Sequence, residues 1–259
     1  WLEARTHRIT GSVIGAICHA NPYESKEEYL RKKVWPREMD ARGKANCLYG
    51  NLNEPKAEQA FDAYMSTFLD ETDATTGLIL RNYEIQNLGL YVCRKPGYAM
   101  LGMSPDGILY STWEDPKDGT ISKRIDLIEY KCPATWEKKV YTNDSIYPDE
   151  WLPKRFPPPL RAELGEYPHS EWLPERKRLP LPSYYNSQVQ YGMELFGMSG
   201  IEMHCCWFVV YSPVRTAVTV VDRDRVHGKW LIDRARTFWN ELYARNHVLK
   251  ESGLLLQDE

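Results

Sequence analysis

Several features are missing from the 259-residue sequence, and each absence excludes a class of protein. No run of about 18 apolar residues occurs, so no membrane-spanning helix and no membrane partner are expected. The six cysteines include no C-x2-C pair, which argues against a zinc finger or an iron–sulfur cluster. Internal repeats and a signal-peptide pattern are also missing. We therefore expect an intracellular protein in a reducing compartment, not a secreted one, with buried structural cysteines.

Composition and charge place the chain among ordinary globular proteins. Hydrophobic residues make up 42% and charged residues 27% of the sequence, and the length suits a single domain spanning 1–259. The net charge of −3 excludes a bulk polycation. Residues 51–150 are acidic and both flanks are mildly basic. This pattern fits a cation site that handles a polyanion, and it also fits an ordinary solvated acidic face.

The hydrophobic periodicity predicts a mixture of helices and strands. Residues 10–12 are expected to cap a short apolar helix, and residues 53–55 to begin a longer one. Strand-like runs separated by turn residues fill 77–131. A helix near 187–197, a hairpin and a long amphipathic helix from about 226 to 250 follow. This order predicts an α/β (α+β) fold with a mixed central β-sheet flanked by helices.

One stretch lacks any such periodicity. Nine of the 17 prolines lie in 148–182, where neither a helix nor a central strand is expected. We therefore interpret about 137–182 as a proline-rich insertion that runs over the surface and faces the substrate.

The residues that carry chemistry belong to two neighbouring predicted strands. Asp106 occupies a tight S-P-D-G corner where one strand starts. In the strand at 125–131, alternation places Glu129 and Lys131 on the same face as two apolar residues. Charges on a buried face need partners. A Mg²⁺ ion held by Asp106, Glu129 and the backbone carbonyl of Tyr130 would supply one, because Mg²⁺ prefers oxygen ligands.

Lys131 lies along the same face, where it would hold or help to deprotonate a metal-bound water. A simpler interpretation stays open at this point. Asp…Glu-x-Lys is a loose pattern, and Glu129 with Lys131 would also form an ordinary surface salt bridge.

The arrangement of these residues resembles the signature of the PD-(D/E)xK nuclease superfamily, and further motifs make the resemblance more specific. The motifs are W-x3-R-x2-R-I-T-G-S at 1–12, G-x3-E at 50–54, SPDG at 104–107, E-x-K-C-P at 129–133 and YYNSQVQYGM at 184–193. In this order they are similar to those of the phage lambda exonuclease group, the YqaJ-type viral recombinases. The resemblance spans nearly the whole chain and implies a restriction-endonuclease-like core.

The resemblance also implies roles for individual residues. Asp106, Glu129 and Glu54 would ligate one or two Mg²⁺ ions, for which Mn²⁺ would substitute, together with the carbonyl of Tyr130. Lys131 would position or activate the attacking water.

A glutamine is expected to complete this catalytic group. Gln188 would orient the nucleophile or Lys131. Gln190 points about 200° away from Gln188 on a helix, so only one of the two is expected at the site.

A pocket for the 5′ phosphate of a DNA end is the other implied site. Arg5, Ser12 and Ser104 fall on the family's motif positions, and Arg8 is a further candidate. A guanidinium, a hydroxyl at a helix N-terminus and a hydroxyl at a tight turn suit a phosphate. Ser12 also reads as an ordinary helix cap.

The implied function is a Mg²⁺-dependent 5′-to-3′ exonuclease on linear double-stranded DNA, which leaves 3′ overhangs for recombination or repair. The implied partners are DNA ends, a single-strand annealing protein and further copies in a trimer. The implied location is a phage-infected bacterium or the host cell of a large DNA virus. A DNA endonuclease of the same fold and an inactive DNA-end-binding protein remain alternatives. The insertion and a lengthened hairpin before Glu129 depart from the family where DNA should approach.

Overall fold

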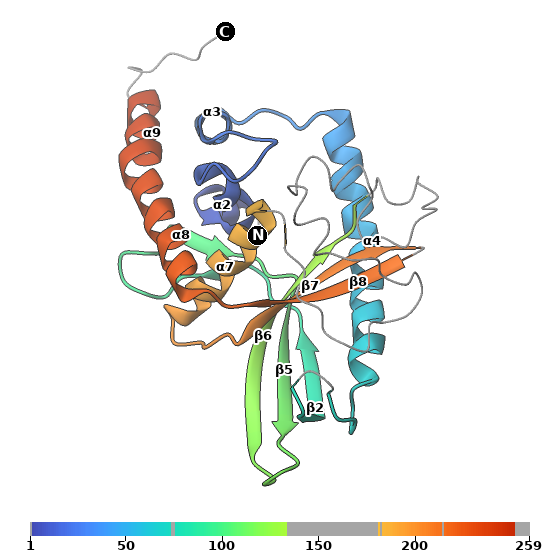
Figure 1. Ribbon diagram of the computed structural model, residues 1–259. Helices are drawn as coiled ribbons and strands as arrows, with labels where there is room; N and C mark the ends of the chain where they lie inside the picture. Colours follow the sequence, from blue (N-terminus) through green and yellow to red (C-terminus); the bar gives the residue numbers. More distant parts are fainter. Residues whose placement is uncertain (1, 74–75, 134–180, 182, 214, 252–259) are drawn as a thin grey trace, which may run out of the picture.

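A computed structural model describes residues 2–73, 76–133, 181, 183–213 and 215–251. A five-stranded sheet lies at the centre, and helices pack against it (Figure 1). The predicted insertion at about 137–182 falls, except for residue 181, outside the described residues.

The central sheet is mixed. Its strands, in spatial order, are β2 (Ile79–Gln86), β5 (Gly107–Glu114), β6 (Ile121–Lys131), β7 (Cys205–Ser212) and β8 (Arg215–Asp222). The pairing of β6 with β7 is parallel, and the other three pairings of this sheet are antiparallel. The predicted mixed central sheet is therefore confirmed.

A small second sheet joins the N-terminal segment to the middle of the chain. It consists of β1 (Ile9–Thr10), β4 (Leu101–Met103) and β3 (Tyr91–Val92), with β4 in the centre. Because β1 runs parallel to β4, the N-terminal motif lies beside the corner at 104–107 that precedes β5.

The helices fall into two sets, which flank the sheet. They are α1 (Leu2–Thr6), α2 (Gly11–Ile17), α3 (Lys26–Val34), α4 (Ala41–Ser66), α7 (Ser183–Gly197), α8 (Arg225–Thr237), the π-helix η2 (Phe238–Tyr243) and α9 (Ala244–Glu251). Within the described ranges, none is long and apolar enough to cross a membrane. The predicted helix at about 226–250 corresponds to α8, η2 and α9 in succession.

Two apolar cores lie on the two faces of the sheet. Leu127 of β6 belongs to the core that α2, α7 and α8 cover, while Ile128 belongs to the core that α4 covers. Successive strand residues point to opposite faces. The alternation therefore puts Glu129 on the same face as Leu127, as the sequence predicts, and α7 covers this face.

The beginning of α4 differs from the prediction. The helix starts well before 53–55, and Asp40 caps its first turn by accepting a backbone hydrogen bond. Asn53 does not cap anything, because its side-chain amide donates to the carbonyl of Tyr49, one turn earlier. Pro55 lies inside the helix. An Asn-x-Pro pattern is typical of a helix start, but Pro55 is exposed here and its missing N–H is tolerated in a long helix.

The cysteines only partly match the expectation. None of the six, all of which lie in the described ranges, forms a disulfide, and three of them are buried: Cys93, Cys205 and Cys206. Cys47 is exposed, and the remaining two are partly exposed. Composition alone does not predict which thiols are covered, since covering depends on tertiary packing.

Candidate active site

A buried carboxylate on β6 forms the centre of the candidate site. The Glu129 side chain is 2% exposed. Its Oε1 atom accepts hydrogen bonds from the Lys131 ammonium and from the Gln188 amide. Its Oε2 atom is buried and has no hydrogen-bond partner among the described residues. A buried carboxylate oxygen without a partner is costly, so this atom marks a place for a bound cation or a further donor.

Asp106 lies next to Glu129 because of the strand register. Gly107, the first residue of β5, pairs with Ile128 of β6, and Asp106 Oδ2 accepts the backbone N–H of Tyr130 at 2.7 Å. Burial raises the pKa of Asp106 well above its usual range, and the negative charge of Glu129 raises it further. Two buried carboxylates oppose each other's ionisation, and a cation between them would relieve that repulsion.

Glu54 contributes a third carboxylate from α4. It is half-buried on α4. Burial raises the pKa of Glu54, the charge of Glu129 raises it further, and Lys131 partly offsets both effects. Three carboxylates from α4, the β5 corner and β6 thus act on one another electrostatically.

Lys131 is held between this acidic group and an aromatic ring. Burial tends to lower the pKa of Lys131, but the charges of Glu129 and Asp106 outweigh burial and raise it above its usual range. The ammonium lies 5.2 Å from the ring centroid of Tyr185 on α7, within the range of a cation–π contact. With side-chain exposures of 22% and 2%, Lys131 and Glu129 are not a solvated surface salt bridge.

Sequence reasoning missed Tyr185 as part of the site. Its ring packs 5.3 Å from that of Phe208, the β7 residue that pairs with Glu129. The available signal was its position one helical turn before Gln188, on a helix expected to face the site.

The two glutamines of the Q-x-Q motif serve different places. Gln188 reaches Glu129, whereas the Gln190 amide donates to the carbonyl of Asp222 at 2.7 Å. The Gln190 oxygen accepts the backbone N–H of Asp224, also at 2.7 Å. The structure therefore brings Gln188, and not Gln190, to the carboxylates.

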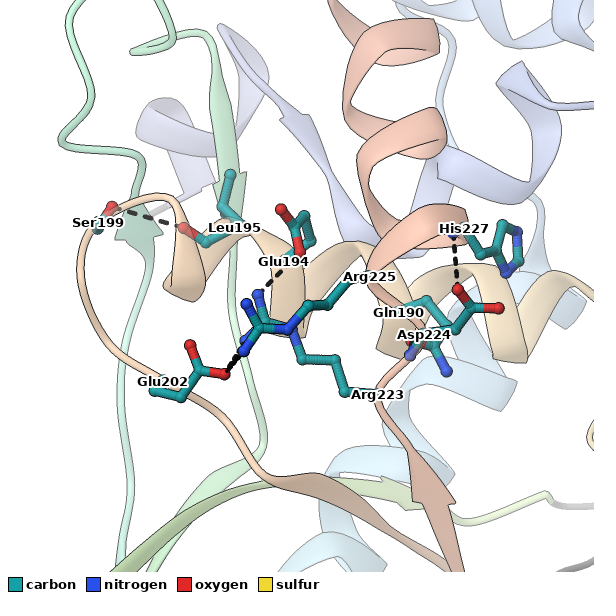
Figure 2. A network of polar contacts seen from close by, with 9 residues as sticks. All are labelled: Gln190, Glu194, Leu195, Ser199, Glu202, Arg223, Asp224, Arg225 and His227. Carbon is teal, nitrogen blue, oxygen red and sulfur yellow. Dashed lines mark hydrogen bonds and ion pairs between the residues drawn. The ribbon is translucent and has the colours of Figure 1, made fainter.

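A polar network fixes the position of α7 beside the β8–α8 connection (Figure 2). Arg223 contacts Glu194 of α7 at 2.8 Å and Glu202 at 3.0 Å, and its side chain is almost fully covered. Asp224 accepts the N–H of His227 at 2.9 Å and so caps α8. Together with Gln190, these contacts set the rotation of α7 that aims Gln188 at Glu129.

Two of the predicted phosphate residues, Arg5 and Ser12, meet at the start of α2. Arg5 Nη2 lies 3.4 Å from Ser12 Oγ. Burial lowers the pKa of Arg5, while the charges of Glu129 and Asp106 act to raise it. The guanidinium is thus within electrostatic reach of the carboxylates.

Two further observations concern the residues predicted to bind the phosphate. The Ser104 hydroxyl is buried and has no hydrogen-bond partner among the described residues. At the first residue of α2, a Cβ on Gly11 would lie 3.4 Å from Cγ of Gln188. The glycine therefore lets α2 approach α7 closely, and it brings the predicted phosphate corner beside the carboxylates.

Residues 1–155 match the family described as the YqaJ-like viral recombinase domain. The chain belongs to this family. The matched residues include all three carboxylates, Lys131 and the predicted phosphate corner, but they end before α7 and Gln188. Comparison with curated proteins gives no match.

Three solved structures similar to this YqaJ-like chain are of proteins named as exonucleases. An alkaline exonuclease (LHK-Exo) from Laribacter hongkongensis shares 20% identity at a TM-score of 0.54, over 98% of this chain and 96% of that chain. Its complex with dAMP gives the same values. The shutoff and exonuclease protein of Kaposi's sarcoma-associated herpesvirus shares 12% identity at a TM-score of 0.40, over 98% and 70% of the two chains. The likeness to LHK-Exo confirms the predicted α/β (α+β) fold.

Two further cations of the YqaJ-like domain lie near Arg5. The Arg8 guanidinium donates to the backbone carbonyls of Ala4 and Ala99, so these contacts tie α1 to the segment just before β4. Lys33 on α3 was missed by sequence reasoning, and its ammonium donates to the carbonyls of Arg8 at 3.0 Å and Arg5 at 3.4 Å. Burial and the charge of Arg5 lower the pKa of Lys33 to about 8.

Proposed function

We propose that this protein is a metal-dependent DNA exonuclease that hydrolyses one strand of linear double-stranded DNA from its 5′ end. One observation carries the proposal. In a YqaJ-like chain, buried Glu129 binds Lys131 and Gln188 through one oxygen and leaves the other oxygen without a partner. The names of the similar structures, alkaline exonucleases, point to the same activity.

The acidic group suits a hard divalent cation. Asp106, Glu129 and Glu54, with the carbonyl of Tyr130, would hold one or two Mg²⁺ ions, and Mn²⁺ would substitute. The donors are all oxygens, Glu129 Oε2 is buried without a partner, and the pKa of Asp106 is raised by burial and by Glu129. When bound, the ion would stabilise charge on the attacking and leaving oxygens of the phosphodiester.

Lys131 and Gln188 position other groups and do not themselves form or break bonds. The ammonium of Lys131 offers N–H donors that hold the attacking water near the phosphorus. Glu129 and Tyr185 keep the ammonium in place. The Gln188 amide holds the Glu129 carboxylate in one orientation, so that its second oxygen is left for the metal ion.

The direction of hydrolysis depends on the corner at the start of α2. Arg5, Ser12 and Ser104 would receive the 5′ phosphate, and Lys33 would add positive charge behind Arg5. Arg8 would support the corner through its backbone contacts rather than touch the phosphate. A terminal phosphate held beside the carboxylates places the first phosphodiester at the metal site. Products with 3′ overhangs, a trimer and an annealing partner belong to the same proposal.

One experiment tests the proposal. Linear duplex DNA that carries a 5′ phosphate on one strand only is incubated with the protein in Mg²⁺, in Mn²⁺ and in EDTA, beside a covalently closed plasmid. We expect metal-dependent loss of the phosphorylated strand and an intact plasmid. Cleavage of the plasmid would instead identify an endonuclease. Tight binding of DNA ends without cleavage in either metal would identify an end-binding protein.

Matched variants connect the result to the site. Lys131→Ala should remove cleavage and keep DNA binding. Ser104→Ala should reduce the preference for the phosphorylated strand while cleavage of unphosphorylated ends continues, because the hydroxyl serves only the terminal phosphate. Equal losses on both strands would overturn the phosphate pocket but not the nuclease.

A further inference from the structure

A second group of metal-binding side chains lies on the opposite face of β6. The carboxylate of Asp126, the imidazole of His204 and the thiol of Cys205 have ligand atoms that all lie within 4.8 Å of one another. Asp126 is three residues before Glu129, so it points to the face covered by α4, away from the candidate active site. Its neighbours there are the buried residues Cys205 and Trp207 of β7.

Hydrogen bonds hold the Asp126 carboxylate in one orientation. The side chain is 3% exposed. Its Oδ1 atom accepts the backbone N–H of Cys205 at 3.2 Å, and its Oδ2 atom accepts the indole N–H of Trp207 at 3.1 Å. Carboxylates that ligate metals are commonly fixed by such outer contacts.

His204 supplies both a ligand and a route of entry. Its Nδ1 atom lies 3.8 Å from Asp126 Oδ1, and its side chain is 54% exposed. The backbone N–H of His204 donates to the carbonyl of Ile125 at 2.9 Å, which fixes the His204 backbone beside Asp126. Cys205 is buried directly after it. The group is therefore anchored on two adjacent strands and open to solvent on one side.

The donor set selects the metal. We propose that Asp126, His204 and Cys205 bind a Zn²⁺ ion, with solvent as the fourth ligand. Thiolate, imidazole and carboxylate are the ligands that Zn²⁺ takes in tetrahedral sites. Mg²⁺ requires oxygen ligands and would not compete well here. On binding, the Cys205 thiol releases its proton to the solvent, and no redox change occurs.

The Zn²⁺ ion would join β6 to β7 where their parallel pairing begins. Asp126 immediately precedes Leu127, which pairs with Cys206. A ligand that binds the folded chain preferentially stabilises it by mass action. We therefore expect Zn²⁺ to raise the melting temperature of the protein whether or not the protein cleaves DNA.

The test uses the full chain with its catalytic carboxylates removed. In an Asp106→Asn, Glu129→Gln background, metal-free protein is titrated with Zn²⁺ and separately with Co²⁺. We expect one equivalent of Zn²⁺ to bind, a rise in melting temperature, and a thiolate-to-Co²⁺ charge-transfer band. Both signals are independent of nuclease activity.

Three variants in this background decide the assignment. His204→Gln should abolish Zn²⁺ binding while leaving the melting temperature of the metal-free protein unchanged, because His204 is exposed. Cys205→Ser should remove the charge-transfer band, and Cys47→Ser, at an exposed thiol, should keep it. The proposal is overturned if no charge-transfer band appears, if the band follows Cys47, or if His204→Gln binds Zn²⁺ as tightly as its parent.

Discussion

Gln188 of α7 and Lys131 of β6 bind the same oxygen of one buried carboxylate, Oε1 of Glu129. This shared acceptor links a helix from the C-terminal part of the chain to the strand that carries the catalytic motif. The other oxygen is left without a partner among the described residues. The orientation of Glu129 therefore depends on where α7 is held.

Removing the Gln188 amide should reduce cleavage without unfolding the protein. We expect Gln188→Ala to lower kcat by roughly 10–100-fold, the range seen when a contact behind a metal ligand is lost. Steady-state kinetics on linear duplex DNA and thermal melting measure the two effects.

Gln190→Ala is the matched control on the same helix. It leaves the Asp222 carbonyl and the Asp224 N–H without their partner, which costs about 1–3 kcal/mol of stability. We expect a lower melting temperature in this variant and a smaller change in kcat than in Gln188→Ala. The reverse pattern would show that Gln190, not Gln188, governs the site.

Asp106→Asn should stabilise the metal-free protein while it abolishes cleavage. The folded state raises the pKa of Asp106, mainly through burial, so the folded chain binds a proton that the unfolded chain releases. Stability from this group is present below the unfolded pKa, near about 4, and is lost as pH rises through the folded pKa. Melting in EDTA across this range should show the wild type losing stability relative to the variant. A constant difference would contradict this.

The ring of Tyr185, rather than its hydroxyl, should support Lys131. We expect Tyr185→Leu to lower kcat by roughly 3–30-fold, since a partly desolvated cation–π contact contributes about 0.5–2 kcal/mol. Tyr185→Phe keeps the ring and should restore most of the rate, with DNA affinity unchanged in both variants. If Phe were as slow as Leu, the hydroxyl would be the functional group.

Lys33 should make the stability of the folded protein increase with pH in the alkaline range. Burial and Arg5 lower the pKa of Lys33 to about 8, below its unfolded value of about 10.4. Between these values the unfolded chain binds more protons, so stability from this group rises with pH. As the pH rises across this window, the melting temperature of the wild type should therefore increase relative to that of Lys33→Met. Lys32→Met, at an exposed neighbour, should show no such gain.

The alternation of β6 was predictable because it is a local property of the backbone. A strand places Glu129 and Lys131 on one face whatever surrounds it, and the structure keeps them there. The separation of Gln188 from Gln190 follows in the same way from the pitch of a helix. The beginning of α4 was not predictable from Asn53 and Pro55, because both residues are accommodated inside a longer helix.

The sequence by itself determined which side chains are available for chemistry and, through strand and helix periods, which of them share a face. Tertiary structure alone decided which faces meet. Tyr185 reaches Lys131, and Asp126 reaches His204, across long stretches of chain. No local period encodes those contacts, because they arise when α7 and β7 pack against β6 and bury the apolar residues on both of its faces.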